Sequence, residues 1–194
     1  MDIPIVLRKA TPEDGPCLAP LILLAGDGVL EFWTCLGSGD ALRRRLAAMV
    51  ADASGPYSHA AFVVAEAGGR IAGIASATPA TSLPLDDPSG VPADRLEHLR
   101  PLRQAWDPGS LYISSLAVDP VQQGRGIGRR LLGHACRHAR DTGFNRVTAH
   151  VWADNTAARH VYHEQGFEPF SHAAIPWHPL LPHRGGTLLL RRFV

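Results

Sequence analysis

A glycine-rich turn between residues 122 and 128 is the part of this sequence best suited to bind a ligand. Its glycines stand at positions 124, 126 and 128, and a stretch with helical periodicity follows them. Glycine lets main-chain N–H groups approach a ligand, and a helix N-terminus adds unpaired N–H groups and the positive end of its dipole. Such a corner suits a pyrophosphate group, although many strand–helix corners need glycine for packing alone.

The spacing of the glycines separates three kinds of phosphate-binding turn. A P-loop requires Gly-Lys-Ser or Gly-Lys-Thr, which this turn lacks, and a dinucleotide fingerprint requires GxGxxG, whereas residues 124–128 follow GxGxG. The turn instead fits Gln-x-x-Gly-x-Gly, with Gln123, Gly126 and Gly128. Further along, residues 155–167 follow Asn-x-x-Ala-x-x-x-Tyr-x-x-x-Gly-Phe.

These two segments, in this order, resemble the acyl-CoA loop and the later motif of the GNAT acetyltransferase superfamily. The resemblance covers about residues 110–170, whereas over residues 1–77 only the order of elements agrees and residues 78–109 match nothing specific. It implies a GNAT-like α/β fold, with a mixed, mostly antiparallel central sheet of about six to seven strands flanked by helices. It also implies acetyl-CoA as co-substrate and an amine as acceptor.

The resemblance further assigns residues to the acyl-CoA site. Backbone groups of a splayed strand would contact the pantetheine arm, the turn would wrap the pyrophosphate, and the Asn155 side chain would bond the cofactor. The expected cofactor-binding residues are Leu116, Ala117, Val118, Gln123, Gly124, Arg125, Gly126, Ile127, Gly128, Arg129, Asn155 and Tyr162. Arg125 and Arg129 either add charge near the phosphates or are solvated side chains. Asn155 alternatively caps its helix, but we favour the cofactor bond because Asp154 next to it could provide the cap.

Tyr162 is the expected general acid. In the family the matching tyrosine lies near the thioester sulfur and protonates the departing thiolate, and a phenol is a neutral donor near pH 7. The alternative is a core aromatic on an amphipathic helix. Many relatives carry a glutamate as base on the strand before the loop, but residues 111–116 contain no carboxylate. Our candidates for the base are therefore Glu31, or Ser115 relaying through ordered water.

The histidines raise the question of a metal site. His134 and His138 stand at i and i+4 on an expected helix, a spacing that a ligand pair can have. No third His, Cys or carboxylate joins them in a motif, so we expect a solvated helix face and no metal. Four residues near the last strands would edge the acceptor pocket or belong to an ordinary loop: His172, Trp177, His178 and His183.

The composition is typical of one globular domain. The 194 residues carry 19 Lys and Arg against 18 Asp and Glu, a formal net charge of +1, and 45% of them are hydrophobic. This balance gives no electrostatic footprint for nucleic acid or an anionic membrane. We therefore expect a single domain over residues 1–194, with a proline-rich insertion at about 78–109 that is either a substrate lid or a tolerated surface insertion.

The cysteines and the N-terminus bear on the compartment. Cys17, Cys35 and Cys136 form no CxxC pair, so neither a disulfide framework nor a zinc motif is indicated. The first residues lack the basic segment of a secretory signal, and the longest apolar run is too short to span a bilayer. We expect a cytoplasmic protein, monomer or homodimer, that binds neither nucleic acid nor a membrane.

Periodicity and turn residues predict the elements that hold these motifs. The expected strands are residues 3–8, 59–66, 70–77, 111–118, 146–152, 167–171 and 187–193. The expected helices are residues 12–26, 38 or 40 to about 50, the end of the glycine turn to about 142, and 154 or 155 to 166, with a short helical pattern at about 95–104 in the insertion. Strands alternate with helices in the second half, which predicts a mixed α/β sheet.

Taken with the motifs, the resemblance implies an N-acetyltransferase that moves an acetyl group from acetyl-CoA to a primary amine. The amine would attack the thioester directly in a ternary complex, and backbone N–H groups of the splayed strand would polarise the carbonyl. The alternative is a non-catalytic acyl-CoA-binding or regulatory module. The missing strand carboxylate favours that alternative, whereas Tyr162 and Asn155 oppose it.

Overall fold

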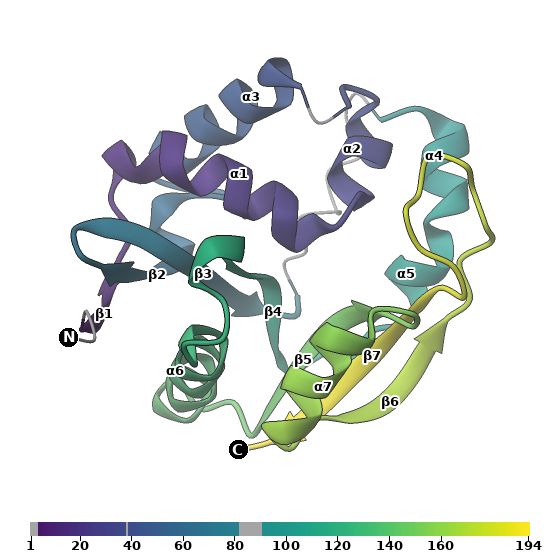
Figure 1. The fold of residues 1–194 in the computed structure, drawn as a ribbon. Helices are drawn as coiled ribbons and strands as arrows, with labels where there is room; N and C mark the ends of the chain where they lie inside the picture. Colours follow the sequence, from purple (N-terminus) through teal and green to yellow (C-terminus); the bar gives the residue numbers. More distant parts are fainter. Residues whose placement is uncertain (1–3, 38, 82–90) are drawn as a thin grey trace.

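A computed structural model of the chain describes residues 4–37, 39–81 and 91–194, and in them seven strands form one sheet (Figure 1). The strand order is β1-β2-β3-β4-β5-β7-β6. The bounds are β1 Ile5–Lys9, β2 Phe62–Ala67, β3 Arg70–Pro79, β4 Leu111–Val118, β5 Arg146–Trp152, β6 Glu168–Ala173 and β7 Thr187–Phe193. Five of the six neighbouring pairs are antiparallel and only β4–β5 is parallel, so the predicted mixed, mostly antiparallel sheet is confirmed.

Helices cover both faces of this sheet. Their bounds are α1 Gly15–Gly26, α2 Val29–Thr34, α3 Asp40–Ala51, α4 Ala93–His98, α5 Arg100–Gln104, α6 Ile127–Asp141 and α7 Thr156–Glu164. Alternation along the strands separates the two layers, because Val64 and Ile74 pack with α1 and α3 whereas Ala65 and Ala75 pack with α6. Figure 1 shows α1 and α3 together on one side and α6 on the other.

Helix α6 is anchored by one apolar face. Its buried side chains include Ile127, Leu131, Ala135 and Ala139, the residues that the helical period places together. Each leucine-sized side chain buried in this way stabilises the fold by about 1.5–3 kcal/mol relative to exposure. Gly143, with φ of 84°, ends the helix in the left-handed conformation that favours glycine. The end of the glycine turn therefore leads directly into a helix that is packed along its length.

The structure departs from the expected elements in two places. Helix α2 was missed because six residues are too short to show a helical period, and Asp27 and Gly28 before it have left-handed backbone conformations. Residues 59–61 form a 3₁₀ turn capped by Ser58 rather than the start of a strand. In the insertion, the helical pattern expected at about residues 95–104 corresponds to two short helices, α4 and α5; residues 82–90 lie outside the described residues, as do Ile3 and Ser38 of the expected elements.

Strands β4 and β5 diverge in the middle of the sheet. Their pairing covers only three residues on each strand, from Leu111–Val147 to Ile113–Ala149. On its other edge β4 stays paired with β3 as far as Val118, with a register shift that leaves Ser114 as the extra residue. The extra residue reverses the alternation of faces, so Ile113 packs against the core under α6 and so does Leu116. The backbone of β4 beyond Ile113 therefore borders an opening instead of a strand.

Candidate functional site

Two cavities meet at the opening between β4 and β5. The first, which we call the α1 cavity, has a volume of about 180 Å³ and is lined by Asp27, Tyr57, Tyr112, Ser115, His150 and Trp152, among others. The second, which we call the loop groove, has a volume of about 610 Å³ and is lined by the glycine turn and one side of α7. The two share Leu116, Asn155, Ala158 and Tyr162. A molecule in the loop groove can therefore reach a molecule in the α1 cavity through this opening.

The glycine turn forms an open cradle at the start of α6. Gly124 and Gly126 have φ angles of 77° and 73°, and a Cβ added to either would meet nothing within 4 Å. The first helical hydrogen bond runs from Arg130 N to Gly126 O over 3.1 Å, so among the described residues the three preceding N–H groups have no partner. These donors and the helix dipole together fit a phosphate group.

Side chains of the turn are occupied by neighbours. Gln123 donates from Nε2 to the Val118 carbonyl over 3.4 Å, and Arg125 contacts the Gln122 side chain. Arg129 forms an ion pair with Glu164 of α7, which lines the same groove. The Arg129 side chain is 58% exposed as well as paired with Glu164, so both expected roles stay open, and a bound phosphate would compete with Glu164.

Tyr162 stands where the two cavities join. Its ring is only 6% exposed and packs edge-to-face on Phe167, with centroids 5.2 Å apart. No residue in the described part of the chain hydrogen-bonds its hydroxyl, and burial raises the pKa of Tyr162 above its usual range. The two interpretations of this residue are therefore compatible, since the ring packs in the core while the residue, a neutral phenol, also lines both cavities.

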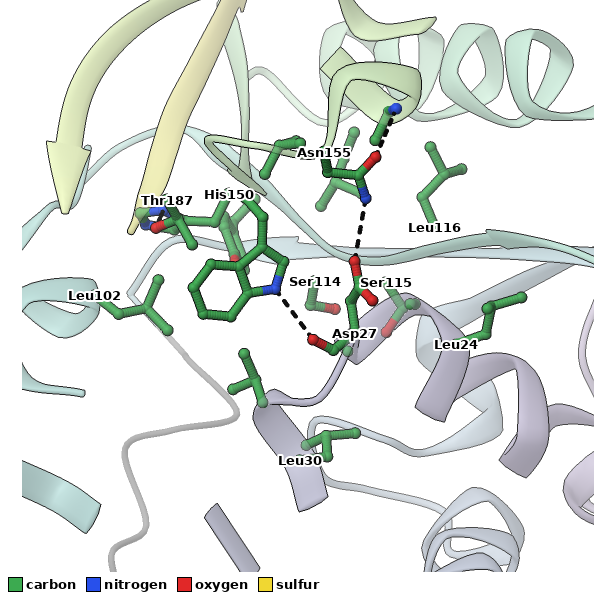
Figure 2. Close-up of a pocket in the computed structure, with 18 of the residues that line it drawn as sticks. Leu24, Asp27, Leu30, Leu102, Ser114, Ser115, Leu116, His150, Asn155 and Thr187 are labelled. Atoms are coloured by element: carbon green, nitrogen blue, oxygen red, sulfur yellow. Dashed lines mark hydrogen bonds between the residues drawn. The ribbon is translucent and has the colours of Figure 1, made fainter. Parts of the chain in front are cut away.

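Asn155 caps α7 and also contacts the end of α1 (Figure 2). Its Oδ1 accepts a hydrogen bond from Ala158 N over 3.0 Å, and its Nδ2 donates to Asp27 Oδ2 over 3.1 Å. The premise that Asp154 could supply the cap is wrong, because Asp154 accepts hydrogen bonds from the His183 ring and the Arg184 backbone instead. Asn155 nevertheless lines both cavities.

The two expected candidates for the general base lie in different surroundings. Ser115 lies on β4, is 3% exposed and lines the α1 cavity. Glu31 lies on α2 outside the described linings of both cavities, and its buried Oε2 has no hydrogen-bond partner among the described residues. The carboxylate that does line the α1 cavity is Asp27, which sequence analysis missed. An Asp-Gly pair at the end of an apolar helix indicates a turn, but it does not indicate where the aspartate side chain points.

His183 connects the loop between β6 and β7 to the α1 cavity. Its Nε2 lies 2.7 Å from Asp27 Oδ2 and its Nδ1 lies 2.7 Å from Asp154 Oδ1, while its ring stacks on Trp152 at a centroid distance of 5.1 Å. Trp152 Nε1 donates to the Asp27 carbonyl over 3.1 Å. None of the four loop residues expected near an acceptor pocket is among the described lining of the α1 cavity, but His183 contacts two residues that line it, Asp27 and Trp152.

His150 is a buried histidine in the wall of the α1 cavity. Its Nε2 lies 2.8 Å from the Ala105 carbonyl, which can only accept, so this nitrogen carries the proton. Its Nδ1 then accepts from the Thr187 hydroxyl over 3.0 Å. Burial lowers the pKa of His150 to about 4, so the ring is neutral near pH 7.

The described residues show neither a metal-binding cluster nor a membrane-spanning helix. Within residues 4–37, 39–81 and 91–194, no group of three or more His, Cys, Asp or Glu side chains is arranged to hold a metal ion. In the same residues no helix has the length and apolar character needed to cross a bilayer. His134 and His138 lie on α6, where burial lowers the pKa of His134.

Comparisons with known proteins relate this chain to one family of acetyltransferases. The model of the acetyltransferase (GNAT) family matches residues 31–167. The chain is 42% identical over 62 residues to a mycothiol acetyltransferase of Rhodococcus erythropolis, and the match covers 32% of this chain and 20% of that protein. The chain thus spans about a fifth of the length of this curated relative.

Solved structures share the whole architecture. An N-acetyltransferase from Staphylococcus aureus Mu50 superposes with a TM-score of 0.70 at 17% identity, over 97% of this chain and all of that one (100%). An acetyltransferase from Salmonella typhimurium, solved with its cofactor acetyl-CoA, superposes with a TM-score of 0.63 at 19% identity, over 97% of this chain and 93% of that one. At these identities the similarity shows the fold.

Proposed function

Because this chain belongs to the GNAT acetyltransferase family, whose model matches residues 31–167 of its 194, we propose that it transfers the acetyl group of acetyl-CoA to a primary amine. The observation that carries this proposal is the opening between β4 and β5, where the loop groove and the α1 cavity share Leu116, Asn155, Ala158 and Tyr162. A donor in the groove and an acceptor in the cavity meet only at this opening.

The loop groove fits acetyl-CoA by its shape and its donors. The unpaired N–H groups of residues 127–129 and the open backbone at Gly124 and Gly126 suit the pyrophosphate. The backbone of Leu116, Ala117 and Val118, left without a strand partner on the β5 side, suits the amide groups of the pantetheine arm. Bound acetyl-CoA supplies an activated acyl group, and these residues hold it with its thioester end toward Tyr162.

The residues around the opening can donate and relay the protons that the reaction moves. The acceptor arrives as an ammonium ion and loses one proton before its nitrogen attacks the carbonyl carbon. The nitrogen–carbon bond forms, the carbon–sulfur bond breaks, and the nitrogen loses a second proton. Tyr162 protonates the departing thiolate and is reprotonated from solvent, so one proton is released overall. Ser115, which lines the α1 cavity, relays a proton through ordered water, and backbone N–H groups of β4 polarise the carbonyl.

We extend the proposal to the domain and its compartment. Residues 1–194 act as one domain, in which the insertion contributes to the acceptor side because Leu102 of α5 lines the α1 cavity. The compartment we propose is the cytoplasm, a reducing environment that keeps the three free cysteines as thiols.

The test separates binding from turnover. Acetyl-CoA binding is measured by calorimetry, and release of free coenzyme A thiol is measured with a panel of primary amines. We expect micromolar-range binding and amine-dependent thiol release, each with a matching acetylated product by mass spectrometry. Tight binding without any amine-dependent release would instead support a non-catalytic acyl-CoA-binding module.

A further inference from the structure

The charge that the described lining of the α1 cavity carries is negative. Among its described lining residues the only carboxylate is Asp27, and no lysine or arginine side chain is present. His150 is held as a neutral ring by its two hydrogen bonds. Asp154, which shares His183 with Asp27, adds a second carboxylate just outside the cavity. Two carboxylates around one imidazole leave a net negative charge whether or not His183 is protonated.

The Asp27 carboxylate is held at one oxygen and open at the other. Oδ2 receives the Asn155 amide at 3.1 Å and lies 2.7 Å from His183 Nε2, whereas no described residue bonds Oδ1. The side chain is 37% exposed. Its backbone has φ of 47° and ψ of 51°, a left-handed conformation that aspartate adopts at some cost and that is retained where the surroundings require it. In Figure 2 this carboxylate lies beside Asn155, with Ser114 and Ser115 lining the same cavity.

The rest of the wall is aromatic or apolar. Tyr57, Tyr112, Trp152 and Tyr162 surround the space, together with leucines such as Leu102. A volume of about 180 Å³ corresponds to roughly six water molecules at liquid density. A small amine with a flat or apolar body fits this space, and aromatic rings attract a nearby cation.

We propose that Asp27 determines the acceptor: its Oδ1 holds the nitrogen of a small primary ammonium ion whose body is apolar or aromatic and carries no carboxylate. This inference rests on the proposed function, because it names the substrate class of that same site. Asn155 and His183 are positioning residues in it, since they fix Oδ2 and thereby orient Oδ1.

The same geometry discriminates against amino acids. The carboxylate of an α-amino acid lies two bonds from its nitrogen, so an amine held at Oδ1 would bring a second negative charge near Asp27. The described lining offers no cation to pair with that charge. Burying an unpaired charge is expensive, and like charges at short range repel strongly where water is excluded.

The test compares phenethylamine with phenylalanine, which differs from it by the carboxylate, and with phenylalanine amide, which keeps the size without the charge. We measure kcat and KM at saturating acetyl-CoA for the parent, Asp27→Asn, and the control Asp141→Asn, an exposed aspartate at the end of α6. Asparagine tolerates the left-handed backbone of position 27, so the variant should fold.

We expect the parent to prefer phenethylamine and phenylalanine amide over phenylalanine. Asp27→Asn should raise KM for phenethylamine by about 10- to 100-fold, since a charge-assisted hydrogen bond is lost, and should reduce the preference over phenylalanine. Acetyl-CoA affinity by calorimetry should not change, and Asp141→Asn should resemble the parent. Equal use of phenethylamine and phenylalanine by the parent, or an unchanged KM in Asp27→Asn, would overturn the inference.

Equilibrium binding measurements test this inference without catalytic turnover, whereas the proposed function is tested by turnover. Phenethylamine and phenylalanine are titrated into the protein in the presence of coenzyme A, which requires no turnover. Binding of phenethylamine that Asp27→Asn abolishes supports the inference even if no product forms, and in that case the proposed function alone fails. Binding of the two compounds with equal affinity contradicts the inference even if the protein acetylates both.

Discussion

Asn155 donates from Nδ2 to Asp27 Oδ2 over 3.1 Å and so joins the N-cap of α7 to the residue that directly follows α1. The two residues are 128 positions apart in the chain. The other end of the same amide caps α7 through Ala158 N. One side chain thus orients both the helix that carries Tyr162 and the carboxylate that lines the α1 cavity, and its two bonds can be separated by substitution.

Asn155→Ser and Asn155→Ala separate the cap from the contact with Asp27. Serine caps a helix about as well as asparagine but cannot donate as the amide does to Asp27, whereas alanine loses both bonds. We expect both variants to raise the acceptor KM, and only alanine to lose about 1 kcal/mol of stability, a shift of about 2–4 °C in Tm. Thermal unfolding and steady-state kinetics check this. Equal Tm values for the two variants would show that the cap contributes nothing.

Gly126→Val tests the phosphate cradle. Valine at a φ of 73° is strained by about 1–3 kcal/mol, so the turn should leave this conformation and move the N–H groups of the α6 N-terminus. Acetyl-CoA affinity by calorimetry should fall by about 10-fold or more.

Gly143→Val is the matched control for that substitution. Gly143 has φ of 84° and, like Gly126, nothing within 4 Å of an added Cβ, but it lies at the opposite end of α6. It should lose similar stability and keep parental affinity for acetyl-CoA. If both variants bind acetyl-CoA equally, the turn does not hold the pyrophosphate.

Tyr162→Phe removes the hydroxyl and keeps the ring packed on Phe167. If the phenol protonates the thiolate, kcat should fall toward the low end of the roughly 10²–10⁴-fold range of general acid–base catalysis, because coenzyme A thiolate is already a fair leaving group. Acetyl-CoA affinity should change little. Because burial raises the pKa of Tyr162, its ionisation should not limit kcat below pH 9. Parental kcat in a folded variant would leave Tyr162 a packing residue.

His150 should make the fold sensitive to acid. Its pKa is about 4 in the folded protein and 6.5 ordinarily, so the unfolded chain binds the proton first as pH falls. The stability it contributes is present above pH 6.5 and is lost between 6.5 and about 4, to a total of roughly 3 kcal/mol. Urea unfolding of the parent and His150→Gln from pH 7 to 4 isolates this effect, since carboxylates affect both proteins alike. Parallel pH profiles would argue against a buried neutral ring.

Local pattern predicted most of the sheet. Strands β4, β5 and β7 agree with the expected residues 111–118, 146–152 and 187–193, because alternation and the flanking turn residues are properties of neighbouring positions. Helix α2 was not predictable in this way, since its six residues hold too little periodic signal and their packing against α4 joins positions far apart in the chain. The alternation of apolar and polar residues also could not show that β4 diverges from β5, because this divergence appears only once both strands are paired in the sheet.

The candidate site likewise has parts that the sequence predicts and parts that only the tertiary structure decides. The sequence by itself determined the glycine turn, because the φ angles at Gly124 and Gly126 and the free N–H groups of α6 depend on adjacent residues. Tertiary structure alone decided that Asp27 and not Glu31 lines the α1 cavity, and that His183 contacts Asp27 from 156 positions away. Contacts at such separations are set by how the layers pack, and no residue's type or near neighbours encode that arrangement locally.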